Sequence, residues 1–312
     1  MSMSCLVTGG SGFIGSHLVD QLLKDGHRIR VLDNFSTGFR HNLADVTSDV
    51  EIIEGDIRDL DQMRSAVRGV DAIFHQAALS SVPRSFADPI ATHENNATGT
   101  LNVLVAARDA DVRRVVCASS SSVYGDAAAE RKREDLPTSP MSPYAVSKVA
   151  TEQYCRAFFI GYGLEAVALR YFNVFGPRQD PNSPYSAVIP RFITALRNGQ
   201  RPTIYGDGLQ SRDFTYVQNV VDANILAATS PGLGGEVFNV ARGDNYSLLD
   251  LAAALKTILG VDLPPTFEKP RAGDVRHSRA DVSKAREMFG FEPRVSFEEG
   301  LRLTAEWYQR QG

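Results

Sequence analysis

The sequence has few cysteines, and they are too far apart to suggest a disulfide framework or a metal site. Only 3 occur among 312 residues, namely Cys5, Cys117 and Cys155. Their number is odd and their spacing fits neither paired disulfides nor a zinc motif. Cys5 and Cys117 lie in apolar, strand-like runs, so we interpret both as small core residues. We therefore predict no metal site and a cytoplasmic location.

Long apolar runs and an excess of one charge are also lacking. No stretch approaches the roughly 20 apolar residues of a membrane span, and residues 1–8 show no basic flank or apolar run of a signal peptide. A formal net charge of −4 gives no attraction to nucleic acid or to anionic membranes. We expect neither as a partner. The length of 312 residues fits a large domain with a smaller lobe.

A glycine-rich turn follows the first apolar run, at residues 5–8, and precedes a helical pattern. Gly9 would permit the tight turn, Gly12 would let backbone amides approach a pyrophosphate at the helix start, and Gly15 would let the helix lie close to the strand. The next strand-like run ends at Asp33, which is 18 residues after Gly15. A carboxylate there accepts hydrogen bonds from the adenosine ribose and repels a 2′-phosphate. This pattern predicts a binding site for NAD.

Strands and helices alternate over the first half of the chain. This alternation predicts an α/β fold with a Rossmann-type, doubly wound parallel sheet. The composition changes at Asn173, and glycines and prolines over residues 176–184 interrupt regular structure. There we expect a smaller α/β substrate-binding lobe to begin. The predicted division is an NAD-binding domain of residues 1–174 plus 217–243 and a substrate-binding domain of residues 175–216 plus 244–312.

Tyr144 and Lys148 form a candidate proton-transfer pair. Pro143 favours the first turn of a helix that we expect to continue to about Tyr162, and residues four apart share a helix face. A nearby ammonium lowers the pKa of a phenol, ordinarily about 10, which predicts a base at the edge of a redox site. Four serines, Ser119 to Ser122, follow another strand-like run. They predict a polar patch at the carboxyl edge of the sheet, or else a solvated turn.

Five motifs together resemble the extended short-chain dehydrogenase/reductases. They are Thr8-Gly-Gly-Ser-Gly-Phe-Ile-Gly15, Ser119-Ser120 with Val123-Tyr124-Gly125, Tyr144 with Lys148, Arg170-Tyr-Phe-Asn173, and Arg271-Ala-Gly-Asp274. Within that family the sequence is similar to UDP-hexose 4-epimerases, in particular to those acting on N-acetylhexosamines. The resemblance implies NAD as cofactor, a UDP-sugar as substrate, and a 4-keto sugar as bound intermediate.

The resemblance also assigns roles to individual residues. Tyr144 would be the catalytic acid and base, Lys148 would bind the nicotinamide ribose, and Ser120 would bond the 4-hydroxyl, with Ser121 or Ser122 left open as helpers. The implied NAD-binding residues, beside Tyr144 and Lys148, are Gly9, Gly12, Phe13, Ile14, Gly15, Asp33, Asn34, Asp56, Ile57 and Ala77. The implied UDP-sugar-binding residues, beside Ser120, Ser121 and Tyr144, are Asn173, Val188, Tyr205, Arg212, Arg271, Asp274 and Ser278.

Substrate choice depends on fewer positions. Sugar 4,6-dehydratases and decarboxylating relatives need an acidic group beside the serine, where this chain has Ser121 and Ser122. Epimerases restricted to glucose and galactose tend to carry a tyrosine at the position of Ser278, so a serine predicts that UDP-GlcNAc and UDP-GalNAc are accepted, with UDP-Glc and UDP-Gal. A UDP-glucuronate 4-epimerase stays open, because Arg178 or Arg191 could meet a carboxylate. An ordinary NAD-dependent dehydrogenase and an NAD-sensing module are the remaining alternatives.

The resemblance further implies a homodimer joined through helices near residues 95–110 and 144–162. Four apolar residues in these segments fit such an interface or, equally well, a domain core: Leu101, Val105, Tyr154 and Phe158.

Overall fold

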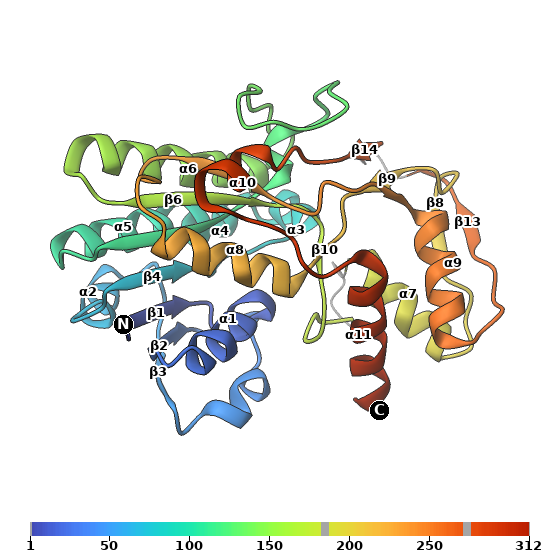
Figure 1. Ribbon diagram of the computed structural model, residues 1–312, viewed down its shortest axis with the longest axis horizontal. Coiled ribbons are helices and arrows are strands. Elements are labelled where there is room, and N and C mark those ends of the chain that lie inside the picture. Colours follow the sequence, from blue (N-terminus) through green and yellow to red (C-terminus); the bar gives the residue numbers. More distant parts are fainter. Residues whose placement is uncertain (1, 182–186, 271–275, 312) are drawn as a thin grey trace.

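A parallel sheet of seven strands organises the larger part of the molecule (Figure 1). The computed structural model describes residues 2–181, 187–270 and 276–311. The strands follow the order β11-β6-β5-β4-β1-β2-β3 and pair in parallel. Their bounds are β1 (Ser4–Thr8), β2 (Arg28–Asp33), β3 (Val50–Glu54), β4 (Ala72–His75), β5 (Arg114–Ser120), β6 (Ala166–Tyr171) and β11 (Val237–Val240).

The direction of strand succession reverses between β1 and β4. β2 and β3 extend the sheet on one side of β1, and β4, β5, β6 and β11 extend it on the other. The loops that leave β1 and β4 therefore diverge to opposite faces and leave a crevice between them. The glycine turn follows β1, so it lies at this crevice.

Helices cover both faces of the sheet. Because successive strand residues face opposite sides, Cys5 and Val7 pack with Leu18 in one core cluster, whereas Leu6 packs with Val103 in another. The first cluster is covered by α1 (Phe13–Lys24), α8 (Val217–Thr229) and α10 (Ser283–Phe289), and the second by α2 (Leu60–Ala66), α5 (Gly99–Asp109) and α6 (Pro143–Tyr162). The predicted doubly wound fold is confirmed.

Helix α6 begins and ends where the sequence predicts. The hydroxyl of Ser142 accepts a hydrogen bond from the amide of Ala145 at 3.1 Å, and Pro143 occupies the first turn. Gly163 ends the helix with φ +70°, a conformation that glycine adopts without strain. The helix predicted near residues 95–110 differs, because a wider turn, η2 (Glu94–Thr98), precedes α5. The other short helices are η1 (Arg40–Val46), α3 (Val82–Ala87), α4 (Pro89–His93) and η3 (Ser121–Tyr124).

A smaller lobe lies beside the carboxyl edge of the sheet (Figure 1). Its core is aromatic: the ring of Phe297 stacks on Tyr246 with centroids 4.0 Å apart, and Phe175 and Phe214 pack around it. The lobe helices are α7 (Val188–Arg197), α9 (Leu248–Leu259) and α11 (Phe297–Arg310). Short strands connect them: β7 (Val174–Phe175), β8 (Thr203–Tyr205), β9 (Ser211–Arg212), β10 (Thr215–Tyr216), β12 (Tyr246–Ser247), β13 (Thr266–Glu268) and β14 (His277–Ser278).

Helix α10 packs differently from what the predicted division implies. It lies within residues 244–312, which we assigned to the lobe, but Ala285, Phe289 and Phe291 belong to a core cluster of the sheet. The ring of Phe289 meets that of Phe238 on β11 edge to face, with centroids 5.0 Å apart. The chain therefore returns to the sheet domain once more before α11, because the outer face of β11 needs an apolar cover.

No helix among the described residues is both long enough and apolar enough to span a membrane.

Candidate active site

A cleft of about 730 Å³ opens at the crevice between β1 and β4. Gly9, with φ +70°, comes so close to the second loop that a Cβ there would lie 2.7 Å from the amide nitrogen of Ala77. A Cβ on Gly15 would lie 2.1 Å from the carbonyl oxygen of Gly9. Only glycine fits these two positions. The predicted residues that line the cleft are Gly9, Gly12, Phe13, Ile14, Gly15, Asp33, Asn34, Ile57, Ala77, Tyr144 and Lys148.

The start of α1 offers backbone amides to this cleft. Gly12 precedes the first helical residue and has no side chain to cap the helix, and the first turn carries no acidic residue. The uncompensated N–H groups and the helix dipole favour an anion at this position. Gly12, Phe13 and Ile14 all line the cleft. The chemistry of this turn fits the pyrophosphate of NAD.

Asp33 stands at the end of β2 with its carboxylate facing two backbone donors. Ser11 N donates to Oδ2 at 2.9 Å, and Phe35 N donates to Oδ1 at 2.8 Å. An ionised carboxylate accepts about four hydrogen bonds, so capacity remains for two hydroxyl groups. Asp33 also lines the cleft. These observations fit a ribose diol at this position.

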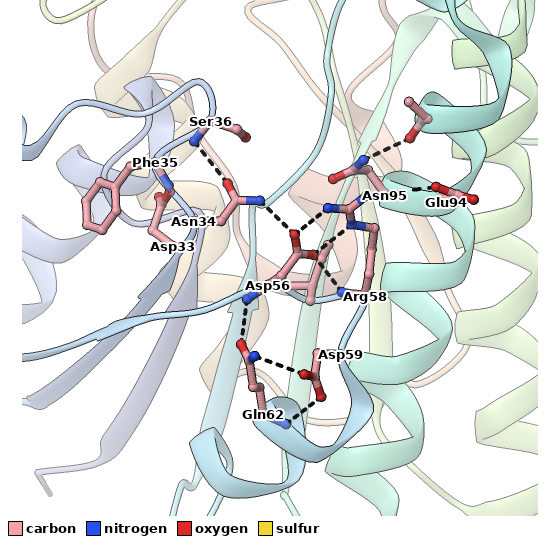
Figure 2. A network of polar contacts seen from close by, with 12 residues as sticks. Asp33, Asn34, Phe35, Ser36, Asp56, Arg58, Asp59, Gln62, Glu94 and Asn95 are labelled. Carbon is pink, nitrogen blue, oxygen red and sulfur yellow. Dashed lines mark hydrogen bonds and ion pairs between the residues drawn. The ribbon is translucent and has the colours of Figure 1, made fainter.

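A polar network lies beside Asp33 at one end of the cleft (Figure 2). Asn34 Nδ2 donates to the carboxylate of Asp56 at 2.9 Å, and Arg58 forms an ion pair with the same carboxylate at 2.7 Å. The hydrogen bond from Arg58 lowers the pKa of Asp56 to about 2. We expected Asp56 itself to contact NAD. In the structure Gly55, Ile57 and Asn34 line the cleft, and Asp56 acts on it by holding Asn34.

Tyr144, Ser120 and Lys148 meet where β5 ends against α6. Ser120 is close enough to Tyr144 to lower the pKa of its phenol. Lys148 Nζ donates to the carbonyl oxygen of Ala118 at 2.9 Å and lies 5.9 Å from the centroid of the Tyr144 ring. The spacing of four residues thus places the phenol and the ammonium on one face, as predicted. Ser121 follows Ser120 in η3, and the buried hydroxyl of Ser122 has no hydrogen-bond partner within the described chain.

The electrostatics of this pair differ from the prediction. Burial raises the pKa of Tyr144, and the nearby Ser120 partly opposes that rise. Burial lowers the pKa of Lys148 to about 8. The expectation that Lys148 lowers the pKa of Tyr144 is therefore wrong for the protein groups alone, because the ammonium bonds Ala118 and both side chains are withdrawn from water.

A buried ion pair lies beneath Lys148. The two carboxylate oxygens of Glu152 accept hydrogen bonds from Arg170 at 2.8 and 2.7 Å, and the hydroxyl of Ser119 donates to Glu152 at 2.5 Å. We did not single out Glu152 in the sequence. Its position four residues after Lys148, on the same helix face, was the available signal.

A second cavity of about 510 Å³ lies in the lobe. It gathers Asn173, Val188, Tyr205 and Arg212, all predicted from separate parts of the sequence to bind the UDP-sugar. Its described lining contains three arginines and no acidic residue: Arg191, Arg201 and Arg212. Arginines present forked donors that suit a diphosphate. Ala187 lines this cavity and the cleft, so the two adjoin.

Gln210 adds an acceptor that we did not predict. Its Nε2 donates to the carbonyl oxygen of Tyr205 at 2.6 Å. Its Oε1 is buried and has no hydrogen-bond partner within the described residues, and Gln210 lines the second cavity.

The remaining predicted residues have different outcomes. Arg271 and Asp274 lie outside the described residues. Ser278 sits on β14, directly opposite Arg212 of β9 in the strand pair. Arg178 lines the cleft but forms an ion pair with Asp20 of α1 at 2.8 Å. Within residues 2–181, 187–270 and 276–311, no three His, Cys, Asp or Glu side chains are placed to hold a metal ion.

Comparison with known proteins agrees with this geometry. Residues 5–241 match the NAD dependent epimerase/dehydratase family. The chain belongs to this family. A UDP-glucose 4-epimerase of Mycolicibacterium smegmatis is 42% identical over 313 residues, which cover 99% of each protein.

Two solved structures are similar over nearly their whole length. One is the UDP-N-acetylglucosamine 4-epimerase from Methanobrevibacter ruminantium M1 in complex with UDP-N-acetylmuramic acid (TM-score 0.96, 42% identity, covering 100% of this chain and 99% of that one). The other is the UDP-glucose 4-epimerase of Thermus thermophilus in complex with NAD (TM-score 0.89, 38% identity, 98% and 99% covered). The chain is an NAD-dependent enzyme, the three relatives named here are UDP-sugar 4-epimerases, which are isomerases, and the predicted resemblance is confirmed.

Proposed function

We propose that the protein interconverts UDP-sugars by inverting the hydroxyl centre at C4 through a bound 4-keto sugar. The observation that carries the proposal is the junction of two cavities. A cleft with a helix start and a ribose-type carboxylate contains Tyr144 and Lys148, and it adjoins a cavity with three arginines. A nucleotide sugar whose diphosphate occupies the second cavity would present its hexose to the first.

NAD, when bound, supplies a hydride acceptor and donor beside C4. The protein's own part is proton transfer and positioning. Tyr144 takes the proton from the 4-hydroxyl and returns it to the same oxygen after the sugar has turned over, while Ser120 shares a hydrogen bond with that oxygen and with Tyr144. Lys148 keeps positive charge next to the ribose of the cofactor. Arg212 and Arg191 hold the diphosphate throughout, Tyr205 packs on the base, and Gln210 Oε1 accepts a hydrogen bond from the base or its ribose.

A direct test uses the purified enzyme after dialysis, without added NAD. It is mixed in parallel with UDP-Glc, UDP-Gal, UDP-GlcNAc, UDP-GalNAc and UDP-glucuronate, and the sugars are separated while the absorbance of NADH is followed. The proposal expects 4-epimers without net NADH. Stoichiometric release of NADH would instead identify an ordinary dehydrogenase, and no conversion of any sugar would refute an enzymatic role on UDP-sugars.

We propose that N-acetylated substrates are accepted. The serine at 278 is small and lies opposite Arg212 in the strand pair, and the proposal assumes that the C2 substituent lies beside it. Ser278→Tyr should abolish turnover of UDP-GalNAc and spare that of UDP-Gal, with Ser278→Ala as the control that keeps both. Equal loss of both activities in Ser278→Tyr would contradict the size argument.

The glucuronate alternative depends on an arginine near the sugar. Arg178 is engaged by Asp20, so Arg191, which lines the second cavity, is the better candidate of the two. Conversion of UDP-glucuronate in the parallel assay, lost in Arg191→Gln while conversion of UDP-Gal is kept, would favour this second function and would leave the diphosphate to Arg212.

We also propose a homodimer, on a different set of residues from those named in the sequence. Phe158 is buried in the core cluster that α5 and α6 cover, and Leu101, Val105 and Tyr154 are half-buried against the same cluster. Exposed apolar side chains occur instead on α3, α4 and α6, which pack side by side: Phe86 is 63% exposed, Ile90 72%, Val146 53% and Ile160 72%. Sedimentation of wild type against Val146→Asp tests this face, and a wild-type monomer would refute it. Location in the cytoplasm stays a prediction.

A further inference from the structure

A single buried carboxylate lies where the lobe joins the sheet domain. Asp213 is fully buried and follows Arg212, the last residue of β9. In Figure 1, β9, β10 and β14 lie between the sheet and the lobe helices. Here the chain leaves the lobe at β9 and enters β10, which pairs with β7. It then continues into α8, a helix that covers the sheet.

The carboxylate of Asp213 accepts hydrogen bonds from two later segments of the chain that also pass between the sheet domain and the lobe. Oδ1 accepts a hydrogen bond from Arg242 N at 3.1 Å, and Oδ2 accepts one from Gly243 N at 3.0 Å. Oδ2 also accepts one from Ala280 N at 3.1 Å. Residues 242–243 lead from β11 into the lobe, and Ala280 leads from β14 back to α10. One side chain therefore ties together three segments that pass between the two domains.

These contacts connect the lobe cavity with the catalytic end of β5. On one side, Asp213 is the neighbour of Arg212, and its own amide donates to the carbonyl oxygen of Ser278 at 2.8 Å. On the other side, Ala241 and Ala280 pack in one buried cluster with Val123 and Tyr124, which follow Ser120 in the short helix η3. The path from Arg212 to Ser120 is thus continuous and buried.

We propose that Asp213 is a positioning residue that sets the nucleotide-binding edge of the lobe, Arg212 and Ser278, against the catalytic segment that begins at Ser120. This proposal rests on the proposed function, because it assumes that Arg212 binds the diphosphate of UDP. A backbone amide at each of the three contacts requires an acceptor, and only a carboxylate supplies acceptors on both oxygens. Replacement by asparagine turns an NH₂ group toward at least one of the amides, so the segments must separate.

The test uses Asp213→Asn in the full-length enzyme as purified, with UDP itself as the probe. We expect the Kd of UDP to rise about tenfold or more, as the loss of buried hydrogen bonds implies, while the NAD content per chain stays at the wild-type level. The matched control is Asp244→Asn, which removes a partly exposed carboxylate of the same turn that pairs with Arg242. Its Kd should stay within about twofold of wild type.

The outcomes separate the two proposals. If wild type fails to bind UDP, the proposed function fails. If wild type binds UDP and Asp213→Asn, measured well below its unfolding temperature, binds it equally well, the positioning role is overturned. Equal losses of UDP affinity and NAD content would also overturn it, because they indicate general disruption.

If Asp213→Asn does not fold, hydrogen exchange in wild type tests the same contacts. Saturating UDP should slow amide hydrogen exchange in peptides covering residues 240–246 and 278–283 by about threefold or more. The reason is that UDP bound to Arg212 would restrict the motion of the adjacent Asp213, whose carboxylate accepts hydrogen bonds from amides in both peptides. Unchanged exchange in both peptides, with UDP bound, would reject the proposal.

Discussion

The cofactor cleft and the lobe cavity adjoin at Ala187 but are built by different means. The cleft takes most of its polar groups from the backbone: a glycine turn, the start of α1 and amides fastened by Asp33. The lobe cavity takes them from side chains, chiefly Asn173, Arg191 and Arg212, that come from segments far apart in the chain. A site built from backbone groups should therefore lose binding when a substitution adds side-chain atoms. A site built from side chains should lose binding when a substitution removes a polar group.

The largest effect is expected at the junction of the two regions. Tyr144→Phe removes only the proton-transfer oxygen, so kcat should fall by about 10²–10⁴-fold, while NAD content and the Kd of UDP stay unchanged. Steady-state kinetics, NAD content and UDP titration measure the three quantities. Tyr162→Phe, at the exposed end of the same helix, is the control and should keep full activity. Full activity of Tyr144→Phe would remove the proposed mechanism.

Added volume should break the cleft and spare the lobe. In Gly15→Ala the new Cβ would lie 2.1 Å from a backbone oxygen, so the free energy of unfolding should fall by about 3 kcal/mol and bound NAD should be lost. Denaturant titration and the NAD content of the purified enzyme measure both. Gly161→Ala, where the added atom meets open space on α6, should be neutral or slightly stabilising. Normal NAD content in Gly15→Ala would show that the turn does not need glycine.

Removal of a polar side chain from the lobe cavity should weaken UDP binding and leave NAD binding in the cleft unchanged. Arg212→Ala should raise the Kd of UDP by about 30-fold, as expected for lost charge-assisted hydrogen bonds, and leave NAD content unchanged. Isothermal titration with UDP measures this, with Arg302→Ala on the outer surface of α11 as the control. If the two variants bind UDP equally, the lobe cavity is not the diphosphate site.

The smallest effect concerns stability and pH. Burial lowers the pKa of Lys148 to about 8 from an ordinary 10.5, so the charged form costs about 3 kcal/mol in the folded state at pH 7. Lys148→Met should be inactive yet more stable at pH 7 by about 1–2 kcal/mol, since it also loses the hydrogen bond to Ala118.

The sign of the pH dependence follows from the lowered pKa. Above pH 10.5 the amine of Lys148 is neutral in both states and burial of its charge costs no stability. As the pH falls below 10.5 the folded protein loses stability relative to the unfolded one, and the loss is complete below about pH 8. The stability advantage of Lys148→Met over wild type should therefore shrink as the pH rises through this range and then reverse, because the neutral amine of wild type keeps its hydrogen bond to Ala118. Denaturant titrations at several pH values measure it, and Lys24→Met, at an exposed position, should show no such trend. A constant difference would mean that the pKa of Lys148 is the same in the folded and the unfolded protein.

Local signals named the residues that meet in one half of the candidate site. The glycine turn, Asp33 and the pair Tyr144–Lys148 each depend on a few consecutive or helix-spaced residues, so their mutual placement follows from backbone geometry. The contact partners of the lobe were not accessible in this way. Asp213 is adjacent to Arg212, which we did predict, but its partners are Arg242, Gly243 and Ala280, and no local pattern connects them.

The electrostatic prediction failed for the same reason. Spacing places Lys148 beside Tyr144, but spacing says nothing about burial, and burial moves both pKa values away from those of free side chains. The assignment of α10 to the lobe failed because the outer face of β11 requires Phe289, a demand visible only once the sheet is assembled.

The sequence by itself determined the family, the order of strands and helices in the sheet domain, the glycine turn and the candidate proton-transfer pair, because these depend on short-range spacing and on the steric needs of glycine. Only the tertiary structure decided which side chains meet across the lobe and how the chain crosses between domains. It also decided how burial changes the acidity of the catalytic groups. Those properties arise from contacts between distant segments and from exclusion of water, which short-range spacing in the chain does not encode.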